Sequence, residues 1–237
     1  PPLFEETELF SRSLGDDSDV VAKEMFTVPR RGEKSSGSWT FRPEGTAGVV
    51  RAYIEAGCPA SAPFQKWFYM GPMFRYERPQ KGRERQFQQF GVEVFGSSSP
   101  LLDAEIVDTA MQFFEGLGFG PELEARVNSM GDAQDRAAWR ESLRSFFSPG
   151  LEGRCEDCRA RFERNLFRLL DCKAEPCQAA NKGAPTLVAV MGKEGSAHHA
   201  TFLAGLEALG REPVADSSLV RGLDYYTRTV FEIHYPP

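Results

Sequence analysis

The chain has 237 residues, a formal net charge of −6, 41% hydrophobic and 26% charged residues, and five cysteines. This composition is typical of a soluble globular protein, and no apolar run approaches the roughly 18–20 residues of a membrane span, so we expect no membrane partner. The odd number of cysteines favours a reducing, cytoplasmic location over a disulfide framework. The acidic total argues against indiscriminate coating of nucleic acid, but it allows an enzyme that holds a polynucleotide through a local basic patch.

The first sixty residues predict a small mixed unit. Residues 1–15 are expected to form an extended entry and a short helix, followed by two short strands at residues 24–29 and 39–43. Helical spacing begins at Thr46, and Gly57 is a plausible stop.

Residues 71–96 predict a basic β-hairpin. The apolar run WFYMGPMF (residues 67–74) and the β-branched and aromatic run FQQFGVEVF (residues 87–95) are typical of strands. The loop between them, residues 75–85, carries five cations against two acids, a net charge of three positive units: Arg75, Arg78, Lys81, Arg83 and Arg85 against Glu77 and Glu84. Such a hairpin can present forked guanidinium donors to phosphate, although a solvated hairpin tip is the simpler alternative.

The second half of the chain becomes mostly helical. A helix is expected from Ser99 and Pro100 to about residue 118, followed by a strand at residues 122–131. Residues 132–217 read as a mostly helical insertion, with helices at 132–147 and 197–209, before strand-forming residues return at 218–235. The expected fold is therefore α+β: one mainly antiparallel sheet flanked by helices, with a helical insertion.

Four of the five cysteines are grouped within that insertion. Cys155 and Cys158 form a CxxC pair, and Cys172 and Cys177 follow after thirteen and four intervening residues. Two closely spaced thiol pairs fit a tetrahedral structural zinc site, and four reduced thiols without a metal are the alternative.

Three segments carry a resemblance to a known family. The hairpin GPMFRYERPQKGRERQFQQFGVEVFG (residues 71–96) resembles motif 2 of the class II aminoacyl-tRNA synthetases, in the form found in histidyl-tRNA synthetases. RPEGTAGVVRAYIE (residues 42–55) and RGLDYYTRTVFE (residues 221–232) are similar to that family's histidine-binding segments. The resemblance implies a class II catalytic core at residues 1–131 and 218–237, a homodimer in the full-length protein, and residues 132–217 as the insertion.

The resemblance also implies roles in ATP binding. Arg75 and Arg221 would be the catalytic cations on the α-phosphate, and Glu77 would lie near the adenine. Arg83 and Arg85 would face ATP and the tRNA acceptor end.

A second set of residues is implied in histidine binding. Glu44 and Thr46 would hold the α-amino group, although a simple helix cap is the alternative for this segment. Gln89 and Glu93 lie four residues apart and so share one face of a strand, either towards the pocket or towards solvent. Tyr226 would contact the imidazole together with Glu93.

The implied function is that of a histidine–tRNA ligase. With ATP and Mg²⁺ it would convert L-histidine to histidyl-adenylate and transfer the histidyl group to the 3′ end of tRNA(His). The alternative is a non-charging regulatory paralogue that binds ATP phosphoribosyltransferase. The sequence stops before motif 3 of the family, so we expect these residues alone to be impaired in adenylation.

Overall fold

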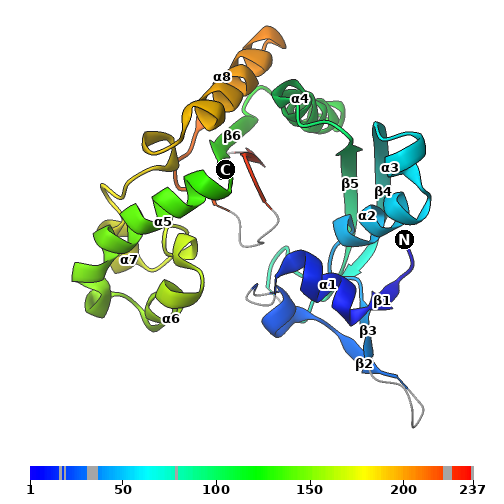
Figure 1. The fold of residues 1–237 in the computed structure, drawn as a ribbon, viewed down its shortest axis with the longest axis horizontal. Coiled ribbons are helices and arrows are strands. Elements are labelled where there is room, and N and C mark those ends of the chain that lie inside the picture. Colours follow the sequence, from blue (N-terminus) through cyan, green and yellow to red (C-terminus); the bar gives the residue numbers. More distant parts are fainter. Residues whose placement is uncertain (16–17, 19, 31–36, 78–79, 221–225, 236–237) are drawn as a thin grey trace. The chain divides into compact units, whose positions relative to one another are not determined.

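The computed structural model describes residues 1–15, 18, 20–30, 37–77, 80–220 and 226–235. They form two compact units, the first within residues 1–97 and the second comprising residues 98–220 together with 226–235. Helices and mainly antiparallel strands make up both units, which confirms the α+β class (Figure 1).

The first unit opens with a three-stranded antiparallel sheet in the order β1-β3-β2. Strand β1 is Phe4–Glu6, strand β3 is Ser38–Phe41 and strand β2 is Thr27–Pro29. Helix α1, Thr7–Leu14, follows β1, and its Phe10 and Leu14 are fully buried because they lie four residues apart on one helix face. A π-helical turn, Val20–Glu24, adds Val20 to this core.

Helix α2, Thr46–Glu55, packs against the hairpin that follows it. Gly57, at φ 69°, ends the helical segment as expected and leads into the short helix α3, Cys58–Ser61. Strands β4, Gln65–Phe74, and β5, Gln86–Phe95, form an antiparallel pair, so the predicted hairpin is confirmed. Tyr53 of α2 stacks on Phe95 of β5 with 4.2 Å between the ring centroids, which fixes the helix on the hairpin.

The second unit contains a sheet in the order β7-β6-β8. Strand β6, Glu124–Ser129, pairs antiparallel with β8, Thr229–His234, and parallel with the short β7, Val214–Ala215. Helices α4, Pro100–Gly116, and α8, Lys193–Ala208, lie side by side (Figure 1). Their contact favours a glycine, because a Cβ on Gly205 would lie 3.0 Å from the Ala104 Cβ, a tight contact.

The helices between β6 and α8 surround a separate core. They are α5, Ala133–Phe147; α6, Glu156–Arg164; and α7, Glu175–Ala180. Three 3₁₀ turns connect them: Ser148–Gly153, Leu166–Leu169 and Leu187–Ala189. Asp132 caps α5, and Trp139, Leu143 and Phe147 at four-residue spacing are fully buried along one face.

The described strands form three sheets: β1-β3-β2 and the pair β4-β5 in the first unit, and β7-β6-β8 in the second. Because each unit is described by itself, the expectation that one sheet runs through the core stays a prediction. None of the described helices combines the length and apolar character needed to cross a membrane.

Candidate functional site

The candidate site begins at the N-terminus of α2, where Glu44 acts as a cap. Its two carboxylate oxygens accept hydrogen bonds from the backbone N–H groups of Thr46, at 2.6 Å, and Ala47, at 2.9 Å. The first turn of a helix has N–H groups without intrahelical partners and carries partial positive charge, so a buried carboxylate is stabilised there. Glu44 is only 4% exposed. The helix-cap interpretation is therefore correct for Glu44, and it does not exclude a second role for this carboxylate.

Thr46 links this turn to the hairpin. Its hydroxyl donates to Glu93 Oε1 at 2.7 Å, so its side chain contacts the next carboxylate and does not cap α2. Burial raises the pKa of Glu93, the negative charge of Glu44 raises it further, and the bond from Thr46 partly opposes the shift. No cation among the described residues contributes to that balance. The structure thus brings Glu44 and Glu93 together at Thr46, whose backbone N–H donates to Glu44 and whose hydroxyl donates to Glu93.

Gln89 lies on the same face of β5 as Glu93. Its Oε1 is buried and has no hydrogen-bond partner within the described ranges. A buried acceptor without a donor is unfavourable, so its presence indicates a place where a ligand donor is expected.

The Tyr69 ring fills the space between these groups, a role that the sequence did not predict. Its ring lies against two glycines: a Cβ on Gly45 would be 2.1 Å from its Cε2, and a Cβ on Gly91 would be 2.2 Å from its Cζ. Gly45 precedes α2, and Gly91 lies between Gln89 and Glu93 on β5. The buried ring is therefore wedged between the helix entry and the strand that carry the candidate histidine-binding residues.

Arg75 is held beside the same turn. Its Nε donates to the carbonyl of Pro43 at 2.8 Å, one residue before Glu44, and its guanidinium lies 5.4 Å from the centre of the Phe87 ring. Glu77 Oε1 lies 3.9 Å from Arg75 Nη1. The hairpin cation therefore shares a backbone anchor with the segment that carries Glu44 and Thr46.

Two further hairpin cations, Arg83 and Arg85, contact Glu77. Arg83 Nη1 donates to Glu77 Oε2 at 3.2 Å, and Arg85 Nε donates to the Glu77 carbonyl at 3.4 Å. The Arg85 guanidinium lies 4.3 Å from the centre of the Tyr76 ring. The four hairpin residues predicted to bind ATP thus form one connected group: Arg75, Glu77, Arg83 and Arg85.

Arg42 is a second residue whose role the sequence did not reveal. Only 8% exposed, it donates to the carbonyls of Pro72, at 2.9 Å, and Pro1, at 2.7 Å. Burial lowers its pKa, while the charges of Glu5 and Tyr69 oppose that shift. Arg42 therefore joins β3, the hairpin and the first residues of the chain.

The two residues expected from the segment 221–232 have different outcomes. Arg221 lies outside the described residues. Tyr226 belongs to the second unit, where its carbonyl accepts from Arg136 Nη1 at 3.2 Å and where it lines a cavity of about 480 Å³ beside β8. Because each unit is described by itself, the pairing of Tyr226 with Glu93 stays a prediction.

The four cysteines of the predicted metal site converge in the second unit. Their sulfur atoms all lie within 4.8 Å of one another, and Cys155 Sγ is 3.8 Å from Cys172 Sγ. A backbone hydrogen bond from Cys158 is the main cause that lowers the pKa of Cys155 to about 7, whereas burial raises the pKa of Cys158 and Cys172. The spacing in the sequence therefore predicted a real cluster.

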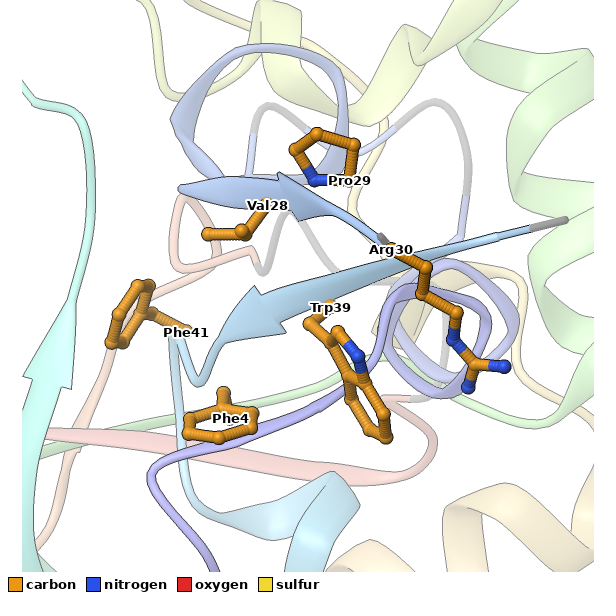
Figure 2. Close-up of a pocket in the computed structure, with 6 residues that line it drawn as sticks. All are labelled: Phe4, Val28, Pro29, Arg30, Trp39 and Phe41. Carbon is orange, nitrogen blue, oxygen red and sulfur yellow. The ribbon is translucent and has the colours of Figure 1, made fainter. Parts of the chain in front are cut away.

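A separate apolar pocket lies on the sheet β1-β3-β2 of the first unit (Figure 2). Its volume is about 350 Å³, and the Arg30 guanidinium lies 4.6 Å from the centre of the Trp39 ring at its edge. The lining residues are Phe4, Val28, Pro29, Arg30, Trp39 and Phe41. None of the predicted site residues that the structure describes lines this pocket.

Comparison with known families decides what kind of protein this is. The family model described as histidyl-tRNA synthetase matches residues 1–131, which include every site residue of the first unit. The chain belongs to the histidyl-tRNA synthetase family.

Its similarity to individual members of the histidyl-tRNA synthetase family extends beyond the matched region. The chain is 48% identical over 234 residues to the histidine–tRNA ligase of Fervidobacterium nodosum, covering 99% of this chain and 54% of that protein. It is 51% identical over 232 residues to the histidine–tRNA ligase of Moorella thermoacetica, covering 98% of this chain and 54% of that protein. The chain therefore spans about half the length of the curated relatives it matches.

Solved structures agree with this assignment. The structure of apo S. aureus histidyl-tRNA synthetase matches with a TM-score of 0.71 and 37% identity, over 98% of this chain and 51% of that one. A Bacillus halodurans protein titled an ATP phosphoribosyltransferase regulatory subunit/histidyl-tRNA synthetase matches with a TM-score of 0.65 and 20% identity, over 99% of this chain and 62% of that one. At that identity, the second match shows the fold alone.

Proposed function

We propose that this chain is part of a histidine–tRNA ligase that activates L-histidine with ATP and Mg²⁺ and transfers it to tRNA(His). The observation that carries the proposal is the pair of carboxylates bridged by Thr46. Glu44 is close enough to raise the pKa of Glu93, and no cation among the described residues appears among the causes that act on the Glu93 pKa. A ligand with a cationic group relieves this repulsion on binding.

The amino group of the substrate is assigned to Glu44 and Thr46. Thr46 uses its hydroxyl proton for Glu93, so the lone pairs of its Oγ1 are available to accept an ammonium N–H. Glu44 is fixed by two backbone N–H groups, so its position is set before any ligand arrives. Held at its amino group, the amino acid keeps its own carboxylate free to react.

The imidazole is assigned to Glu93, with Tyr226 as the expected second contact. A neutral imidazole offers one N–H donor and one acceptor nitrogen. Glu93 accepts from the donor, and the unpartnered Gln89 Oε1 on β5 is left to accept from a second donor of the substrate, an N–H of its ammonium group. A site whose buried polar groups are matched only by imidazole rejects apolar side chains by roughly 10⁴–10⁵.

Activation forms a bond between a carboxylate oxygen of histidine and the α-phosphorus of ATP. The bond from that phosphorus to the bridging oxygen breaks, and pyrophosphate leaves. Arg75 is proposed to position the phosphate and offset the growing charge, because the bond from its Nε to Pro43 O fixes the guanidinium beside this turn and does not use the Nη groups. Arg221 is proposed as the second cation, and Mg²⁺, bound chiefly through the nucleotide, would supply further positive charge to the phosphates.

Transfer then uses a hydroxyl of the terminal ribose of tRNA(His). The hydroxyl oxygen attacks the carbonyl carbon of the adenylate, AMP leaves, and the hydroxyl proton is released. Arg83 and Arg85 are proposed to face the ATP and the acceptor end, with Glu77 holding them together and lying near the adenine.

The proposed organisation follows the family. Residues 1–131 and 218–237 form the catalytic core, and residues 132–217 are an insertion. The antiparallel pairing of β6 with β8, the strands on either side of that segment, supports this division. A homodimer of the full-length protein and a cytoplasmic location are proposed on the same basis.

The deciding experiment is the exchange of pyrophosphate into ATP by the full-length parent protein. We expect exchange that depends on histidine and is not supported by other amino acids. A non-charging regulatory paralogue that binds ATP phosphoribosyltransferase would give no such exchange. Absence of histidine-dependent exchange from folded protein would therefore reject the proposed activity.

A further inference from the structure

We propose that Cys155, Cys158, Cys172 and Cys177 bind one Zn²⁺ ion in tetrahedral four-thiolate coordination, and that this ion stabilises the helical segment around it. The amino acid and ATP sites are formed by other residues, so the proposal is independent of the proposed activity.

The spacing of the sulfur atoms fits zinc. Zinc–thiolate bonds of about 2.3 Å in a tetrahedron give sulfur–sulfur separations of about 3.8 Å. Cys155 and Cys172 have that separation, 3.8 Å, and all four sulfurs lie within 4.8 Å of one another. A disulfide would require about 2.0 Å, and all four thiols are free.

The ligands come from two short pieces of chain that meet only in the folded protein. Cys155 immediately precedes α6 and Cys158 lies in its first turn, whereas Cys172 precedes α7 and Cys177 lies within it. Two pairs with short internal spacing, separated by thirteen residues, are typical of structural zinc sites.

Backbone groups around the cluster are arranged for thiolates. The N–H of Cys155 lies 3.3 Å from Cys177 Sγ and donates to it. The N–H groups of Cys158 and Ala174 are directed to the sulfurs of Cys155 and Cys172. Such donors around the first ligand sphere orient metal ligands and compensate their negative charge.

The surroundings indicate a structural ion. Four protein ligands fill a tetrahedral sphere and leave no position for water or substrate. Cys158, Cys172 and Cys177 are buried in the core that contains Trp139 and Phe162.

The helices that carry the ligands need such support. Helix α6 has nine residues and α7 has six, fewer than the ~12–15 that make an isolated helix marginally stable in water. Arg154 and Asn181 close the loop next to the cluster, with Nη1 donating to Oδ1 at 2.9 Å, and Asn181 Nδ2 donates to the Leu169 carbonyl at 2.8 Å. A metal that joins α6 to α7 fixes the same junction from the other side.

The experiment measures metal in full-length protein purified with reductant and without chelator. Elemental analysis should find one zinc per chain. Cys155→Ser is the chosen variant because Cys155 is the least buried of the four. Its zinc affinity should fall more than 100-fold, since loss of an outer-sphere contact alone costs about 10–100-fold. Cys58→Ser, which alters the one cysteine outside the cluster, is the matched control and should retain full zinc.

A second measurement keeps the proposal testable if the variant misfolds. In the wild-type protein, removal of zinc by a chelator should lower the Tm, and added zinc should restore it. Replacement of zinc by Co²⁺ should give the thiolate charge-transfer and intense visible bands of a tetrahedral site. Zinc-free protein that keeps its Tm, shows no tetrahedral Co²⁺ spectrum, or carries a disulfide in place of two thiols would overturn the proposal.

Discussion

Replacing Glu93 by Gln is expected to weaken histidine binding and, at pH values above the raised pKa of Glu93, to stabilise the unliganded protein. The amide is nearly the same size as the carboxylate, and its oxygen can still accept from the Thr46 hydroxyl. What changes is the charge, together with the group that faces the imidazole N–H.

The loss of binding follows from that mismatch. The carboxylate accepts from the imidazole, whereas the amide NH₂ places a donor against a donor. A hydrogen bond to a charged group contributes about 1.5–3 kcal/mol, so the Kd for histidine should rise about 10- to 150-fold.

The gain in stability follows from the pKa of Glu93. Burial, and then the charge of Glu44, raise that pKa in the folded state, so the folded protein binds this proton more tightly than the unfolded chain does. The stability that the folded protein gains from this tighter proton binding is fully present at pH values below the ordinary pKa of a carboxyl group. It is lost as the pH rises through the higher pKa that Glu93 has in the folded state. Gln does not titrate, so the unliganded variant should be the more stable protein above that pKa, and the difference should shrink towards acid pH.

Two measurements test this reasoning in the full-length protein. Titration calorimetry gives the Kd for histidine and for ATP, and thermal unfolding from about pH 4 to about pH 8 gives the stability profile. Glu8→Gln is the matched control, because that side chain is 85% exposed, and it should change neither property. Unchanged histidine affinity, or equal weakening of histidine and ATP, would refute the assignment of Glu93.

Three further predictions concern other residues of the first unit, and one of them has a matched control. Arg75→Ala should slow adenylate formation by about 10²–10³-fold in single-turnover assays, and a rate near wild type would remove Arg75 from the phosphate site. Gly91→Ala places a methyl group 2.2 Å from the Tyr69 ring, so denaturant unfolding should show a loss of ~1–3 kcal/mol. In the control Gly116→Ala, the added methyl group meets nothing within 4 Å, so the free energy of unfolding should stay within ~0.5 kcal/mol of the wild-type value. Equal effects of the Gly91 and Gly116 substitutions would contradict the steric argument. Arg42→Leu leaves buried carbonyls without a hydrogen-bond donor, which should lower the free energy of unfolding by ~1–3 kcal/mol for each carbonyl. If calorimetry shows a decrease of less than ~1 kcal/mol, water replaces the guanidinium as the donor.

Local chemistry explains why much of the fold could be predicted. Gly57 at positive φ ends the α2 segment where the sequence indicated, and the hairpin strands β4 and β5 coincide with runs of aromatic and β-branched residues. The closeness of the thiols within each cysteine pair was likewise predictable from the short spacing, whereas the meeting of the two pairs depends on the fold.

Features that depend on distant contacts could not be predicted. The place of Tyr69 depends on register, since Tyr69 is paired with Gly91 only once β4 and β5 are aligned. Helix α8 begins at Lys193, four residues earlier than predicted, because Asp135 of α5 accepts from the Gly192 N–H at 2.8 Å. No pattern within residues 190–200 contains that information.

The cap formed by Glu44 has a consequence for how this site tolerates change. One carboxylate holds the start of α2 and is also the proposed acceptor for the substrate's amino group. Exchange for an amide would turn an NH₂ group towards backbone donors, and exchange for the shorter Asp would withdraw the oxygens from them. A shift of α2 by one residue would move the Glu44 carboxylate, the proposed acceptor, without changing the identity of any residue that contacts the ligand. Selection of the substrate's amino group is therefore sensitive to insertions and deletions along the helix, well away from the pocket itself.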